Sequence, residues 1–115
     1  MATLLAHELL GAPMVLPPLA DAGLADEVVW LHHFSWHVGS VAVVAMAAMF
    51  LYASVKAGNL PMAFIASLMS LGFALLGIGL GVLGSSAMWG TPAPYVWTVI
   101  AVLGLFGLWS AKEAR

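Results

Sequence analysis

Three histidines lie within residues 31–40, in the first long apolar stretch of the chain: His32, His33 and His37. Polar side chains are costly inside a bilayer, so those found there usually face a partner, a cofactor or a water-filled cavity. Cysteine is absent, which excludes disulfides, thiolate catalysis and iron–sulfur ligation. Any redox role would therefore need a cofactor held by histidine or methionine. No acid–base pair lies within an apolar run, so an enzyme is not expected.

His33 and His37 are four residues apart and project to one face of a helix. This spacing can supply two ligands to one metal ion. A zinc or copper site normally needs a third or fourth ligand. Glu27 is the expected third metal ligand, and His7 and Glu8 are further candidates.

The histidines are expected to lie at different depths in the membrane. His32 and His33 have a second interpretation, as amphipathic rings at the headgroup level beside Trp30 and Trp36. His37 lies about 13 Å from the start of its apolar run, at 1.5 Å per residue. At that depth it must bond to a neighbouring helix, bind a cofactor, or serve a quinone or proton site. Imidazole suits each of these roles.

A haem would need two ligands facing each other if it were held within one subunit. The second and third apolar runs contain no histidine. A bis-histidine haem therefore requires His7 to fold back over His37, a second copy of the chain, or a different subunit. The candidate cofactor-binding residues are His37, His33 and His7. The candidate cofactors are haem, a chlorin-type pigment or a transition metal.

Three apolar runs, over residues 28–56, 61–84 and 94–111, must position these side chains. Of the 115 residues, 63% are hydrophobic and 7% charged, whereas globular domains have about 25% charged residues. A membrane-spanning helix needs roughly 20 residues to cross about 30 Å of hydrocarbon. We therefore expect an all-α membrane protein with a three-span bundle over residues 28–115, and no soluble domain.

The segment 1–27 is expected to lie outside that bundle. Residues 2–12 favour a helix, but they are too few to cross a membrane. Pro13, Pro17 and Pro18 are expected to interrupt the helix after that point. The prediction is a short interfacial or partner-packed helix on the external side.

Small residues on the second and third runs predict close helix packing. Gly77 and Gly81 form a GxxxG pair on the second run, and Gly104 and Gly107 are small residues at helical spacing on the third run. Such residues let helix backbones approach closely in lipid. The expected partners are other membrane subunits or copies of this chain.

The cations predict the orientation. Lys56 follows the first run, and Lys112 and Arg115 follow the third, whereas residues 84–93 carry no charge. The positive-inside rule then places the C-terminus in the cytoplasm and the N-terminus in the periplasm of a bacterial inner membrane. The histidines lie toward the periplasmic side. The net charge of −2 gives no basic footprint for nucleic acid.

Two short motifs stand on either side of a proline-rich stretch: His7-x-x-Leu10-Gly11, and Trp36-His37-x-x-Ser40 at the head of an apolar run. This order resembles a group of small uncharacterised bacterial multi-spanning membrane proteins. The match covers residues 7–45. The resemblance implies a multi-spanning membrane fold and marks His7, Trp36, His37 and Ser40, but it implies no activity.

Two functions from different classes follow. The first is a small accessory subunit that packs against a larger membrane complex of the respiratory or photosynthetic kind. The alternative is a histidine-dependent protein that binds haem or metal near the periplasmic face. A transporter or channel is less favoured, because three spans enclose a pore only by oligomerisation.

Overall fold

The computed structural model describes residues 2–56 and 59–113, which form helices and no strand. The all-α class is therefore confirmed. Residues 57–58 of the turn after Lys56, and the cation Arg115, lie outside the described residues. In order, the elements are α1 (Ala2–Leu5), the π-helical η1 (Ala6–Gly11), α2 (Ala12–Ala20), α3 (Asp26–Val55), α4 (Leu60–Gly79), the π-helical η2 (Leu80–Gly84), the 3-10 helix η3 (Ser86–Gly90) and α5 (Ala93–Glu113).

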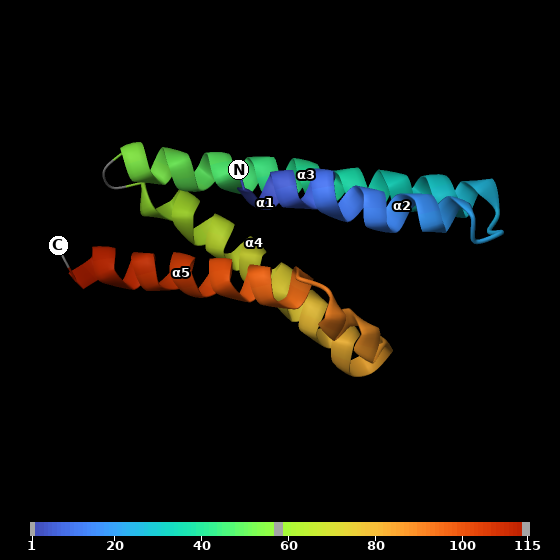
Figure 1. The fold of residues 1–115 in the computed structure, drawn as a ribbon. Helices are drawn as coiled ribbons and strands as arrows, with labels where there is room; N and C mark the ends of the chain where they lie inside the picture. The colour runs from blue at the N-terminus through green and yellow to red at the C-terminus, as the bar shows by residue number, and fades with distance from the viewer. Residues whose placement is uncertain (1, 57–58, 114–115) are drawn as a thin grey trace. The chain divides into compact units, whose positions relative to one another are not determined.

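The chain divides into two compact units, Met1–Ala48 and Met49–Arg115. In the first unit, α1, η1 and α2 form one continuous N-terminal helix that runs antiparallel to α3 (Figure 1). In the second unit, α4 packs antiparallel against α5, and η2 and η3 lie in the connection between them (Figure 1). Each unit is thus built around a helical hairpin.

Four helices in the described residues are long and apolar enough to cross a membrane: Thr3–Ala20, Asp26–Val55, Leu60–Gly84 and Ala93–Glu113. Their length and composition indicate a membrane protein. The predicted count of three spans is not confirmed, because the N-terminal helix adds a fourth candidate. The prediction that the N-terminal helix stops before the prolines is wrong, since it continues to Ala20.

A widened turn precedes the first proline of this helix. A proline lacks an N–H, and its ring displaces the carbonyl four residues earlier. Just before Pro13, the Ala12 N–H donates to the His7 carbonyl, five residues back. Such π-helical adjustments re-satisfy backbone groups that prolines leave free in membrane helices. The helix ends in a turn where Gly23 takes a φ of 66°, a conformation that side chains with a Cβ rarely adopt.

Small residues form the contact between α4 and α5. The buried positions of this hairpin are Ala66, Ser67, Ser70, Ala74, Gly77, Gly81, Pro94 and Ala101. The hydroxyl groups within it bond to their own helices, with Ser67 donating to Ala63 O at 2.7 Å and Thr98 donating to Pro94 O at 2.6 Å. The serines and the threonine therefore bring little unmet polarity to the apolar contact.

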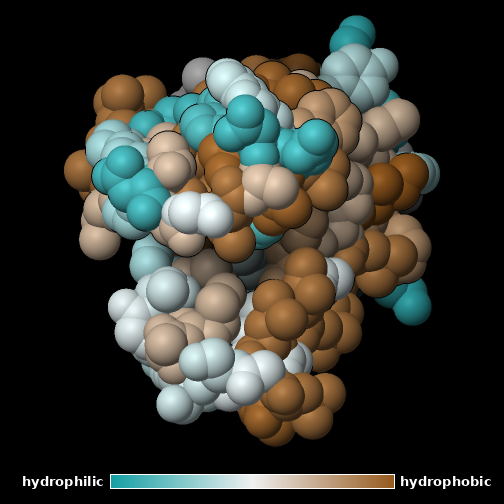
Figure 2. All heavy atoms as spheres, turned by 90° about the vertical axis from the view of Figure 1, so that its right-hand side faces the viewer, coloured by the Kyte–Doolittle hydropathy of each residue, from teal (hydrophilic) through white to brown (hydrophobic). Residues whose placement is uncertain are grey.

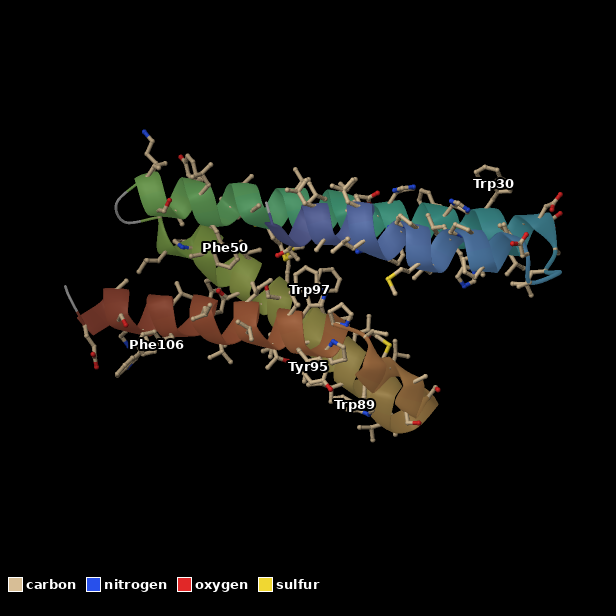
Figure 3. The ribbon with its side chains drawn as sticks, viewed as in Figure 1. Trp30, Phe50, Trp89, Tyr95, Trp97 and Phe106 are labelled. Atoms are coloured by element: carbon tan, nitrogen blue, oxygen red, sulfur yellow. The ribbon has the colours of Figure 1, made fainter. Side chains whose placement is uncertain are left out.

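The outward surfaces are apolar along the helices and polar at the turn of the first unit. Trp30 projects from α3 on the side away from α2 and is 69% exposed (Figure 3). Hydrophilic side chains gather over the turn between α2 and α3, where Asp21, Asp26 and Glu27 are exposed (Figure 2). This distribution fits helices that face lipid and a turn that faces water.

Candidate functional site

Five side chains meet between the N-terminal helix and α3, and we call them the polar cluster: His7, Glu8, Trp36, His37 and Ser40. Adjacent positions on η1 supply His7 and Glu8. On α3, Ser40 lies three residues after His37 and four after Trp36, so it shares part of the helix surface with each of them. The antiparallel hairpin brings these two short segments to the same level.

The carboxylate of Glu8 joins the two helices. The Ser40 hydroxyl donates a hydrogen bond to Glu8 Oε1. The Nδ1 atom of His37 lies 3.6 Å from the same oxygen, close enough for an ion pair when the imidazole is protonated. The Glu8 side chain is 31% exposed and that of His37 is 57% exposed. The other ring nitrogen of His37, Nε2, has no hydrogen-bond partner among the described residues.

His7 packs flat on Trp36. The two ring centroids are 4.1 Å apart and the ring planes differ by 6°. The Nε2 atom of His7 lies 3.3 Å from the Trp36 carbonyl oxygen, which can only accept, so this nitrogen carries a hydrogen. His7 therefore does fold back onto α3, as one of the haem hypotheses required. However, its Nε2 bonds to the backbone instead of facing a metal.

Two glycines lie beside this stack, and Gly11 is the one whose missing side chain makes room for it. A Cβ at Gly11 would lie 3.0 Å from Trp36 Cη2 and Cζ2, and a Cβ at Gly39 would lie 3.6 Å from His7 Nε2. The indole N–H of Trp36 is buried and has no acceptor in the described part of the chain. An unmet buried donor costs about 1–3 kcal/mol, which the tight ring packing must offset.

The remaining metal candidates lie apart from the polar cluster. His33 contacts Trp30, with ring centroids 5.2 Å apart, and His32 Nδ1 donates to Val28 O at 2.8 Å. Within residues 2–56 and 59–113, no three His, Cys, Asp or Glu side chains gather in a group that could hold a metal ion. The structure therefore does not bring Glu27 and His33 together with His37 as a three-ligand set.

The predicted packing glycines differ in what they contact. Gly77 faces Pro94, where an added Cβ would lie 3.3 Å from the Pro94 Cα. Gly104 faces Ser67, and an added Cβ would also lie 3.3 Å from Phe50 Cζ. Gly77 thus lies against a neighbouring backbone, as GxxxG-type packing requires, whereas Gly104 lies against side chains.

The other two glycines behave differently. Gly81 lies under the ring of Trp89, whose Nε1 donates to the Gly81 carbonyl at 3.1 Å. Gly81 thus seats an indole ring rather than a neighbouring helix backbone. An added Cβ at Gly107 would meet nothing within 4 Å in the described structure, so a packing role for Gly107 would need a contact from outside this chain.

An open recess of about 270 Å³ lies near the loop end of the second unit. Trp89 and Tyr95 lie beside each other there, with the Tyr95 hydroxyl donating to Trp89 O at 3.1 Å (Figure 3). The lining is apolar and carries no acid, base or nucleophile apart from hydroxyl groups: Ile78, Trp89, Pro94, Tyr95, Thr98 and Val99. The recess can accommodate an apolar group, but it offers little chemistry.

Comparison with protein-family models, with curated proteins and with solved structures finds no match to this chain. What the candidate site can do therefore follows from the residues of this chain alone. The polar cluster places the Glu8 carboxylate beside His37 Nδ1, and it presents the other imidazole nitrogen outward. These two properties limit the chemistry open to the protein.

Proposed function

We propose that this chain is a small integral membrane accessory subunit that packs against a larger membrane complex. The supporting observation is the outward position of His37 on α3, a helix apolar enough to span a membrane. Its side chain is more than half exposed, and its Nε2 has no partner among the described residues. A ring nitrogen without a hydrogen-bond partner is costly in lipid, so we expect the partner of Nε2 to come from outside the chain.

The remaining polar side chains favour a packing role over transport. Ser54, Ser67 and Thr98 each donate to a carbonyl of their own helix, so they do not line a path for a polar solute. The exposed helix surfaces are otherwise apolar and suit either lipid or a neighbouring helix. A complex of the respiratory or photosynthetic kind is the favoured partner class, because such complexes hold cofactors that imidazole ligates.

The proposal includes a location for this subunit. We infer a bacterial inner membrane, with Lys112 in the last turn of α5 on the cytoplasmic side. The polar cluster then lies in the periplasmic half of the bilayer, because α3 runs inward from Asp26.

Native electrophoresis of the tagged chain, extracted from its own cells in mild detergent, tests the accessory role. We expect an assembly several times heavier than the lone chain, partly dissociated by His37→Phe. A contact of this kind contributes about 1 kcal/mol, which corresponds to roughly fivefold weaker association. His32→Phe is the matched control, since His32 is exposed and bonds within its own helix. A lone-chain mass for the wild type would refute the proposal.

A histidine-dependent haem- or metal-binding protein is the second candidate function. The specific observation in its favour is the Glu8 carboxylate beside His37 Nδ1. Metal-ligating histidines usually present their other ring nitrogen to such a carboxylate, which orients the ring and raises its basicity. An absorbance spectrum of the purified chain together with metal analysis separates this function from a purely structural one.

A further inference from the structure

We propose that His37 Nε2 is the axial ligand of a metal-bearing tetrapyrrole of the haem b type, which lies flat on the outward face of α3. This inference rests on the second candidate function and specifies its ligand. Three observations carry it: the orientation of the imidazole, the lack of companion ligands, and the apolar surface on both sides of His37.

The imidazole is oriented as a ligand. Its Nδ1 lies 3.6 Å from Glu8 Oε1, and that carboxylate is itself held by the Ser40 hydroxyl. In the neutral tautomer with its hydrogen on Nδ1, the imidazole faces the carboxylate with that hydrogen and carries its lone pair on Nε2. Nε2 has no protein partner in the described residues, and the side chain is more than half exposed. Glu8 thus acts as a positioning residue for an outward-facing electron-pair donor.

The number of protein ligands that a metal needs separates a bare metal ion from a tetrapyrrole. A bare zinc or copper ion needs three or four protein ligands. The described residues contain no group of three His, Cys, Asp or Glu placed to supply them. The macrocycle of a haem brings four nitrogen ligands of its own, so one histidine of this chain suffices as the proximal ligand when the haem lies on the outer surface instead of being held within the subunit. The absence of companion ligands therefore favours a tetrapyrrole over a free metal ion.

The surface around His37 can support a flat apolar ring. Phe34 and Val41 lie about one turn on either side of it on the same helix face, and they are 67% and 69% exposed. Seven residues separate them, which is about 10 Å along the helix axis. A macrocycle bonded to Nε2 would lie across this stretch and cover both side chains. The other side of the ring would face the bilayer or a partner subunit.

Titration of the purified full-length chain with haem b in detergent tests the inference. We expect saturable binding with a shifted Soret band relative to haem in empty micelles. His37→Ala should abolish the shift, and imidazole added to the buffer should restore it by entering the vacated position. Glu8→Gln should weaken binding by about 10- to 100-fold and change the spectrum, as loss of a second-shell partner does. His32→Ala is the matched control and should bind as the wild type does.

Three results would overturn the inference. The first is a wild-type spectrum identical to that of haem in micelles. The second is saturable binding that His37→Ala leaves unchanged, with helix content verified by circular dichroism. The third is stoichiometric binding of Zn²⁺ alone that His37→Ala removes, which would make the site a metal-ion site. Native electrophoresis of the same samples separates this question from the accessory role, because a lone chain that binds haem refutes only the accessory role.

Discussion

At the scale of single residues, Ser40 and Glu8 make the contact that most clearly depends on both helices of the first unit. The Ser40 hydroxyl lies 3.5 Å from the Trp36 carbonyl of its own helix and also donates to a carboxylate on the other helix, whereas within the described residues Ser67 and Thr98 in the second unit bond only to their own helices. A carboxylate in an apolar setting needs such donors, because the charged form loses solvation there. Ser40 is therefore expected to stabilise the hairpin rather than α3 alone.

Replacing Ser40 with alanine tests this role. We expect Ser40→Ala to lower the free energy of unfolding by about 1 kcal/mol, the usual scale of a polar contact between membrane helices. The measurement is reversible unfolding in mixed micelles followed by circular dichroism. Ser35→Ala is the matched control, since Ser35 is exposed on the same helix. If Ser40→Ala and Ser35→Ala unfold alike, the hydrogen bond to Glu8 adds nothing to the stability of the hairpin.

The chemistry-bearing residues were largely predictable, but their pairing was not. His7 and His37 stand out because polar side chains are rare in apolar runs, and Glu8 was a candidate ligand for the same reason. The stack of His7 on Trp36 and the bond from Ser40 to Glu8 depend on the two helices running side by side. One signal was present: Glu8 and Ser40 lie equally far along the chain from Leu24. This symmetry has meaning only once a helical hairpin is assumed.

At the scale of elements, the prolines of the N-terminal helix produced the main error. In water, Pro17 and Pro18 within a helix would argue for a break, because the lost hydrogen bonds are not recovered. In this apolar helix the Ala12 N–H finds the His7 carbonyl across the widened turn before Pro13, and the helix continues through Pro17 and Pro18 to Ala20. The long apolar helices α3, α4 and α5 were predictable because their composition leaves no alternative in lipid.

Two glycines on α5 offer a matched test of the α4–α5 contact. Gly104→Leu should destabilise the second unit by about 1–3 kcal/mol, because the new side chain would overlap Ser67 and press on Phe50. Gly107→Leu places the same side chain in open space and should be neutral or slightly stabilising, since leucine favours a helix. Thermal unfolding of both variants in detergent measures the difference. Equal melting temperatures would show that Gly104 is not at a close contact.

At the scale of the whole molecule, the fourth candidate span changes the expected topology. Three spans place the N-terminus in the periplasm when the C-terminus is cytoplasmic. If Thr3–Ala20 also crosses the membrane, both ends lie on the cytoplasmic side. The two arrangements differ only in the N-terminal helix, because the proposed orientation of α3 is the same in both.

Reporter fusions at each end distinguish the two arrangements. We expect a reporter active only in the cytoplasm to give signal at both termini, because the N-terminal helix is as long and apolar as a span requires. A fusion after Ser86, in the connection between α4 and α5, is the control and should be active only as a periplasmic reporter. A periplasmic signal from the N-terminal fusion would restore the three-span topology with an interfacial first helix.

The hairpin of the first unit also bears on how the chain enters the membrane during synthesis. Residues 7–40 contain the whole polar cluster, and they are synthesised before α4 and α5. The tight turn at Gly23 lets the two helices enter as a pair, with Glu8 and Ser40 already bonded. The insertion machinery then receives one hairpin whose polar groups largely bond to each other. His37 is the side chain of the polar cluster that still faces outward, with a ring nitrogen unpaired among the described residues.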